Sequence, residues 1–133
     1  MKDSSSEAER WYRQAENDFA FARHGFAGEF YAQVCFQCHQ VAEKALKAIH
    51  ISTLAQRVVI GHSLLKLGRE IGITDELIDP LSILDQYYIP TRYPNGIPDG
   101  APFEVYTRGQ AEEALSTAAD ILAHAKERIS LDQ

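Results

Sequence analysis

Residues 31–51, YAQVCFQCHQVAEKALKAIHI, decide the fold. The apolar residues of this stretch recur at the spacing of one face of an α-helix. They are Tyr31, Val34, Cys35, Cys38, Val41, Ala42, Ala45, Leu46 and Ile49. No glycine or proline interrupts them. The pattern predicts a long helix that starts near Glu29 and ends near Ile51, with this stripe in the protein core.

The same helix carries a second stripe, which contains Phe36, Gln40 and Glu43. A helix with two partly apolar sides is typical of a central position in a bundle or of a dimer contact. Lys44 and Lys47 point away from the main apolar stripe. Charged residues at this spacing usually form a solvent-exposed face. The alternative is that these two lysines add positive charge to a binding site.

Four further segments carry helix signals. The first helix is predicted to begin with a capping box of Ser6 and Glu9 and to end at Gly25 and Gly28. The other predicted boundaries are a cap at Ser63 with an end at Gly72, a start at Thr74 with a restart at Asp79-Pro80, and a capping box of Thr107 and Gln110. No strand pattern is convincing. We therefore predict that residues 1–133 form one all-α domain, an antiparallel bundle of about five helices with an ordered core from about residue 7 to residue 130.

Residues 89–106, IPTRYPNGIPDGAPFEVY, hold four of the five prolines, so no helix is expected there. A loop of this length in a compact domain is often functional. Within it, Arg92 lies between prolines that restrict the backbone, next to Tyr93. A fixed guanidinium can pair with phosphate or carboxylate, and a tyrosine ring can stack on a base. The alternative is that Arg92 forms a salt bridge with Asp85 or Glu104 and pins the loop to the bundle.

The composition argues against several classes of protein. Apolar residues make up 45% and charged residues 24% of the chain, which are ordinary values for a globular domain. The formal net charge of -6 argues against non-specific nucleic-acid binding through a broadly basic surface, although a local basic pocket remains compatible with it. The first residues contain no apolar signal region, and no apolar run approaches the roughly 18 residues of a membrane span. We expect a cytoplasmic protein that does not bind membranes.

The sequence CFQCH, which begins at Cys35, matches the C-x-x-C-H site of c-type haem attachment. Cys35 and Cys38 fall on the apolar stripe, where cysteine behaves as a small hydrophobic residue. The only methionine is the first residue, so the common methionine ligand of haem iron is missing. A zinc site would need these cysteines, His39 and a fourth ligand such as His24 or His124. We predict buried core cysteines and no haem, metal or other cofactor.

The pair Arg57 and His62 has the spacing R-x4-H. A histidine can act as acid or base in RNA cleavage while an arginine stabilises the phosphate charge. A pair at such spacing is expected about once by chance in a chain of this composition. The alternative is that His62 caps or anchors the third helix and that Arg57 is a solvated loop residue.

Four motifs in this order resemble the HEPN domain family (higher eukaryotes and prokaryotes nucleotide-binding). They are W-x3-A-x2-D from Trp11 to Asp18, FQCHQVAEKALKAIH at residues 36–50, GHSLLKL at residues 61–67 and YYIPTRYPN at residues 87–95. The resemblance spans roughly residues 8–126. It implies an all-α bundle of about five helices that is usually a homodimer.

In many members of that family, an R-x4-6-H motif near the last helices cleaves RNA in a site completed across a dimer. This sequence departs from the motif. No histidine follows Arg92 within that range, and the first histidine after Arg108 is His124. The chain is therefore more similar to the branch that has an RYP loop and lacks the nuclease motif.

The resemblance implies a non-catalytic module that binds a nucleotide, or that is the partner subunit of a minimal nucleotidyltransferase in a toxin–antitoxin-like pair. In that role Arg92 would contact phosphate and Tyr93 would stack on the base, with Lys44 or Lys47 adding positive charge. The alternative is a metal-independent HEPN ribonuclease that uses Arg57 and His62.

Overall fold

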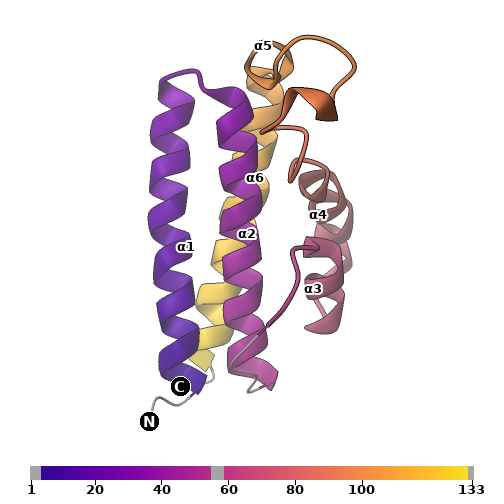
Figure 1. Cartoon of the computed structure of the whole chain (residues 1–133). Coiled ribbons are helices and arrows are strands. Elements are labelled where there is room, and N and C mark those ends of the chain that lie inside the picture. Colours follow the sequence, from indigo (N-terminus) through magenta and orange to yellow (C-terminus); the bar gives the residue numbers. More distant parts are fainter. Residues whose placement is uncertain (1–3, 55–58, 132–133) are drawn as a thin grey trace.

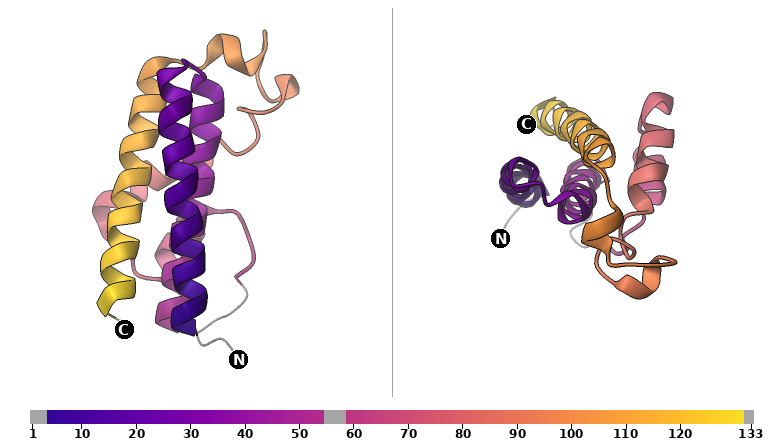
Figure 2. Two further views of the ribbon diagram at one scale, coloured as in Figure 1. Left: turned by 90° about the vertical axis from the view of Figure 1, so that its left-hand side faces the viewer. Right: turned by 90° about the horizontal axis from the view of Figure 1, so that it is seen from above.

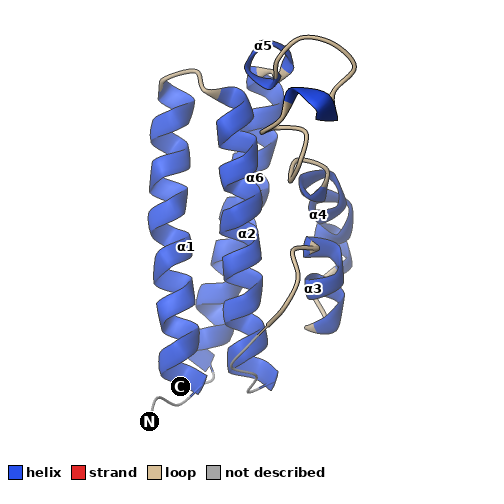
Figure 3. Cartoon of the chain, in the orientation of Figure 1, coloured by secondary structure: helices blue, strands red, loops and turns tan. Residues whose placement is uncertain are grey.

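Three long helices form one half of the molecule. The computed structural model describes residues 4–54 and 59–131, and within these ranges the chain is helical and has no strand (Figure 3). The helices α1 (Ser4–Ala27), α2 (Tyr31–Leu54) and α6 (Arg108–Leu131) each contain 24 residues and lie side by side (Figure 1). At 1.5 Å per residue, each is about 36 Å long. The predicted all-α fold is confirmed.

A second layer covers the other side of α2. It consists of α3 (Leu64–Glu70), a 3-10 turn at Asp75–Leu77 and α4 (Ile78–Asp85). Viewed along the bundle, α1, α2 and α6 group together and the α3–α4 layer stands beside α2 (Figure 2). The helix α2 is thus covered on both sides, and this central position explains its two stripes.

The first two helices both begin at residues that differ from the sequence prediction. The helix α1 already begins at Ser4, so Ser6 lies inside it and does not cap it. The helix α2 begins at Tyr31 and not at Glu29, because Glu29 has a φ of 66°, in the left-handed region that a right-handed helix cannot contain. The backbone N–H of Phe30 donates to the Gly25 carbonyl over 3.0 Å and closes the turn.

The two later caps are confirmed. The Ser63 hydroxyl accepts a hydrogen bond of 3.1 Å from the backbone N–H of Lys66 at the start of α3. Before α6, the Gln110 side chain accepts from the backbone N–H of Thr107 over 2.9 Å, and the Thr107 hydroxyl accepts from Gln110 N–H over 3.2 Å. These reciprocal bonds are a capping box.

Two predictions about the proline-containing segments need correction. The helix α4 begins at Ile78, so Asp79 lies in its first turn and is not the cap. The prolines of segment 89–106 predict no helix, but the segment forms a 3-10 turn at Pro94–Gly96 and the short helix α5 at Pro102–Val105. Proline is accepted at the first position of a helix because its missing N–H has no partner there.

The core lies between the three long helices and extends under the second layer. Its fully buried side chains include Leu46, Ile49, Leu64, Leu81 and Ile121, which come from both layers. No helix in the described part of the chain is long and apolar enough to cross a membrane.

Candidate functional site

Arg92 is held in one orientation by the segment that follows α4. Its Nε donates a hydrogen bond of 2.9 Å to the Tyr88 carbonyl. The guanidinium carbon lies 4.4 Å from the centre of the Phe36 ring, 4.7 Å from that of Tyr88 and 5.2 Å from that of Tyr93. Cation–π contacts of this kind fix a guanidinium without neutralising its charge.

The Arg92 charge has no carboxylate partner among the described residues. Both candidates for a salt bridge are engaged elsewhere, since Asp85 pairs with His39 and Glu104 accepts a 3.0 Å hydrogen bond from the backbone N–H of Ala101. The structure therefore contradicts the alternative in which Arg92 pins the loop through Asp85 or Glu104.

Close contacts between backbone atoms within the loop fix the conformation of the loop that carries Arg92. A Cβ atom at Gly96 would lie 2.9 Å from Pro90 Cα, so only glycine permits this approach. Upstream, the Thr91 hydroxyl donates to the Tyr87 carbonyl over 2.5 Å. The neighbouring residue Tyr93 is 49% exposed, which leaves an aromatic surface beside the guanidinium.

His62, which lies just before α3, contacts the same aromatic cluster. Its ring stacks on Tyr88 with 4.9 Å between centroids and 19° between planes. Its Nδ1–H donates to Glu43 Oε1 over 2.9 Å. The side chain of His62 is 56% exposed, while that of Glu43 is 7% exposed. We call the surface formed by Phe36, His62, Tyr88, Arg92 and Tyr93 the Arg92 face.

Glu43 is shared between two positive or protonatable groups. The second is Lys47, whose Nζ lies 3.1 Å from Glu43 Oε2 and 5.8 Å from the centre of the Trp11 ring. Lys47 is buried, so the prediction of a solvent-exposed lysine face on α2 is wrong for this residue. Since Lys47 balances Glu43, the carboxylate can orient His62 without making the Arg92 face negative.

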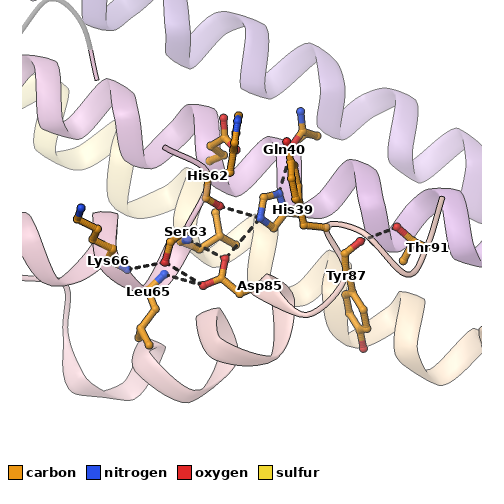
Figure 4. A network of polar contacts seen from close by, with 12 residues as sticks. His39, Gln40, His62, Ser63, Leu65, Lys66, Asp85, Tyr87 and Thr91 are labelled. Atoms are coloured by element: carbon orange, nitrogen blue, oxygen red, sulfur yellow. Dashed lines mark hydrogen bonds and ion pairs between the residues drawn. The ribbon is translucent and has the colours of Figure 1, made fainter. Parts of the chain in front are cut away.

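A buried histidine connects this face to the α3–α4 layer. His39 Nε2 donates to the His62 carbonyl over 3.1 Å and lies 3.4 Å from Asp85 Oδ1 (Figure 4). Asp85 accepts hydrogen bonds from the backbone N–H groups of Leu64 and Leu65 over 2.7 and 3.0 Å. The Asp85 carboxylate thus accepts from the free backbone N–H groups at the N-terminus of α3 and also pairs with His39 of α2. These contacts fix the loop that carries His62.

The pKa of Asp85 reflects this environment. Burial raises the pKa of its carboxyl, but the hydrogen bonds from His39 and from the backbone of Leu64 and Leu65 outweigh burial, so the pKa is below its usual value. Asp85 is therefore charged at neutral pH and acts as a permanent anionic cap.

Lys44 lies on a different part of the surface. It pairs with Asp18 of α1 and lines an open groove of about 720 Å³ together with Glu7, Arg10, Trp11, Arg13, Gln14 and Asn17. The groove runs along the first half of α1. The structure therefore brings Arg92 and Tyr93 into contact, whereas Lys44 pairs with Asp18 and Lys47 pairs with Glu43.

The CFQCH segment contributes to the core. Cys35 and Cys38 are free thiols with no exposed surface, as predicted. Burial raises the pKa of Cys35 to about 12 and raises that of Cys38 further. His39 contacts Gln40, His62 and Asp85. In the ranges 4–54 and 59–131, no three His, Cys, Asp or Glu side chains form a group that could hold a metal ion.

The Arg57–His62 pair is placed only in part. Arg57 lies outside the described residues, so the structure gives no geometry for the pair. His62 does anchor the start of α3, but it does so through its backbone carbonyl, and the cap itself is Ser63.

The sequence did not reveal the four residues whose contacts hold the Arg92 face in position. They are His39, Glu43, Asp85 and Tyr88. Each forms its key contact with a segment at least 19 positions away, except for the turn between Tyr88 and Arg92. The signal that could have found Glu43 was the second stripe of α2, which predicts that residues at its positions face another part of the chain. No such pattern covers His39, Asp85 or Tyr88.

Comparisons with known proteins agree with this architecture. The HEPN domain model matches residues 8–129. The structure of TT1696 from Thermus thermophilus is 38% identical, with a TM-score of 0.84, over 91% of this chain and 97% of that chain. ST0689, an archaeal HEPN homologue, is 34% identical, with a TM-score of 0.77, over 97% and 99% of the two chains.

A HEPN domain protein from Thermotoga maritima is 29% identical, with a TM-score of 0.72, over 91% of this chain and 98% of that chain. No match was found among curated proteins. The family model and the two structures above 30% identity cover nearly the whole chain. The chain therefore belongs to the HEPN domain family.

Proposed function

We propose that this chain is a non-catalytic HEPN module that binds a nucleotide at the Arg92 face. The observation that carries the proposal is the state of Arg92. Its guanidinium is fixed by one backbone carbonyl and three aromatic rings, yet no carboxylate of the described residues neutralises it. A preorganised cation of this kind loses little conformational entropy when it pairs with phosphate.

The neighbouring groups suit the other parts of a nucleotide. Tyr93 is half exposed next to the guanidinium and offers a surface on which a base can stack. Lys47 contributes indirectly, because it balances the charge of Glu43 beneath the face. Lys44 lines the separate α1 groove and would not contact a ligand bound at Arg92.

A calorimetric titration with ATP and with GTP tests this proposal. We expect binding by wild-type protein and a loss of at least about tenfold in affinity in Arg92→Gln, because a phosphate contact disappears. The matched variant is Arg13→Gln, which removes an exposed arginine from the α1 groove and should bind as wild type does. Absence of heat with both nucleotides, or an effect of Arg13→Gln equal to that of Arg92→Gln, would contradict the proposal.

We also propose that the module works as a homodimer and as the partner subunit of a minimal nucleotidyltransferase, in a toxin–antitoxin-like pair. This part rests on membership of the HEPN family. Light scattering after size-exclusion chromatography should give twice the mass of the chain, and a monomer at micromolar concentration would contradict the dimer. A tagged chain should co-purify with a nucleotidyltransferase encoded beside it, and separation of the two would contradict the pairing.

A second candidate function is RNA cleavage with His62 as the acid or base. One observation favours it. Glu43 accepts from His62 Nδ1–H, which leaves Nε2 directed away from the carboxylate on a half-exposed ring, as in other oriented histidine bases. A ribonuclease should degrade single-stranded RNA and lose this activity in His62→Ala. Intact RNA after incubation with wild-type protein would exclude this function.

A further inference from the structure

The Arg92 face carries a second group that can hold a phosphate. His62 Nδ1 is committed to Glu43, so Nε2 is the nitrogen available to a ligand. The described residues place no hydrogen-bond partner on Nε2. When an imidazole carries both of its protons, each ring nitrogen is a donor, so Nε2 is the atom of this ring that can donate to an anion.

His62 and Arg92 are positioned by the same aromatic ring. The His62 ring lies 4.9 Å from the Tyr88 ring centre, and the Arg92 guanidinium lies 4.7 Å from it. Tyr88 itself contacts Phe36 and His39 of α2 at 6.2 and 4.9 Å between centroids. The His62 imidazole and the Arg92 guanidinium, from segments about 30 positions apart, therefore contact the same ring.

The local charge favours a doubly charged ligand. The charged and titratable groups around His62 are Glu43, Lys47 and His39 from α2, Asp85 from α4, and Tyr88 and Arg92 from the segment that follows. Lys47 balances Glu43, and His39 lies beside Asp85. Of these described residues, the two exposed ones that remain are His62 and Arg92, and each can offer N–H donors to an anion.

We propose that His62 and Arg92 form a clamp for a terminal phosphate, so that the ligand of this face is a phosphate monoester such as a nucleoside 5′-monophosphate. This inference rests on the proposed nucleotide-binding function and names the chemical group that the site selects. A phosphate monoester carries about -1.5 to -2 charge near pH 7, whereas a diester carries a single charge. The monoester also exposes three terminal oxygens, enough to accept from both cations.

The test compares three probes by calorimetry: adenosine 5′-monophosphate, adenosine 3′,5′-cyclic monophosphate and adenosine. At about pH 6.5, where a histidine is substantially protonated, we expect the monoester to bind about tenfold more tightly than the cyclic diester. The preference should fall as the pH rises to about 8.5, because an imidazole is neutral at that pH and offers no second positive charge. The ionisation of the phosphate itself acts in the opposite direction, so a falling preference reports on the histidine.

The decisive variant is His62→Gln, which keeps a polar side chain but cannot become cationic. It should bind both phosphates about equally and show no fall in preference with pH. His24→Gln, which removes an exposed histidine from the last turn of α1, should behave as wild type does. Equal affinities for monoester and diester in wild-type protein, with no effect of His62→Gln, would overturn the clamp while leaving nucleotide binding intact. No binding of any probe would overturn the proposed function and the clamp together.

Discussion

The two sides of α2 are both buried, but they are buried in different ways. The side that contains Cys35, Ala42 and Leu46 is fully buried in the hydrophobic core, which α2 shares with both layers. The side that contains His39, Glu43 and Lys47 is covered by the α3–α4 layer and α1, and its contacts are ion pairs and hydrogen bonds. The first side determines that a bundle forms, and the second holds the Arg92 face in a defined geometry.

The largest effect is expected on the apolar side. Leu46→Ala removes a fully buried side chain from the centre of the bundle and should lower the free energy of unfolding by about 3–5 kcal/mol, through lost burial and the cavity left behind. Urea denaturation followed by circular dichroism measures it. A loss below about 1 kcal/mol would show that this side is not the main source of stability.

On the polar side, the free energy of unfolding should fall when one member of an ion pair is removed, even if the volume of the side chain is kept. Lys47→Met leaves Glu43 buried and should cost about 2–3 kcal/mol, less than for a fully uncompensated charge because His62 remains as a partner. The double variant Glu43→Leu with Lys47→Met should recover most of this loss, since no buried charge is left. Equal instability of the single and double variants in urea would contradict this account.

The carboxylate of Asp85 gives the polar side a pH dependence. Its folded-state pKa is lowered, so its contribution is present above the unfolded pKa of about 3.9 and is lost as the pH falls through the folded value. Asp85→Asn should cost about 1–2 kcal/mol at neutral pH, and the difference from wild type should shrink below about pH 4. The exposed Asp79 of α4 provides the matched variant, Asp79→Asn, with little effect at either pH. A difference that stays constant down to pH 3 would contradict the role of Asp85.

The smallest effect is expected from the thiols of Cys35 and Cys38, which should not react in the folded protein. Burial raises the pKa of Cys35 to about 12, and neither thiol is exposed, so a disulfide reagent at about pH 8 should find almost no thiolate. Both thiols should react once the protein is unfolded in urea. Immediate reaction of the native protein would mean that the apolar side of α2 opens easily.

The same contrast explains which features could be predicted from the sequence. The apolar stripe of α2 predicts its own burial, because periodicity is a local property, and the caps at Ser63 and Thr107 also depend on neighbouring residues. The pattern places the start of α2 two residues early because the left-handed conformation of Glu29 depends on how the turn closes. The partners of His39 and Glu43 lie on other segments, so their roles follow only from the fold. Arg92 and Tyr93 could be proposed as site residues from the sequence because the prolines around them restrict the backbone locally.

The most direct test of the central claim, that ligand binding belongs to the Arg92 face, is to map the ligand on isotope-labelled protein by NMR. Adenosine 5′-monophosphate should shift the signals of His62, Tyr88, Arg92 and Tyr93 in a saturable manner. The signals of Arg10, Trp11 and Arg13 in the α1 groove should stay in place. Shifts confined to the α1 groove, or no shifts at millimolar nucleotide, would contradict the account.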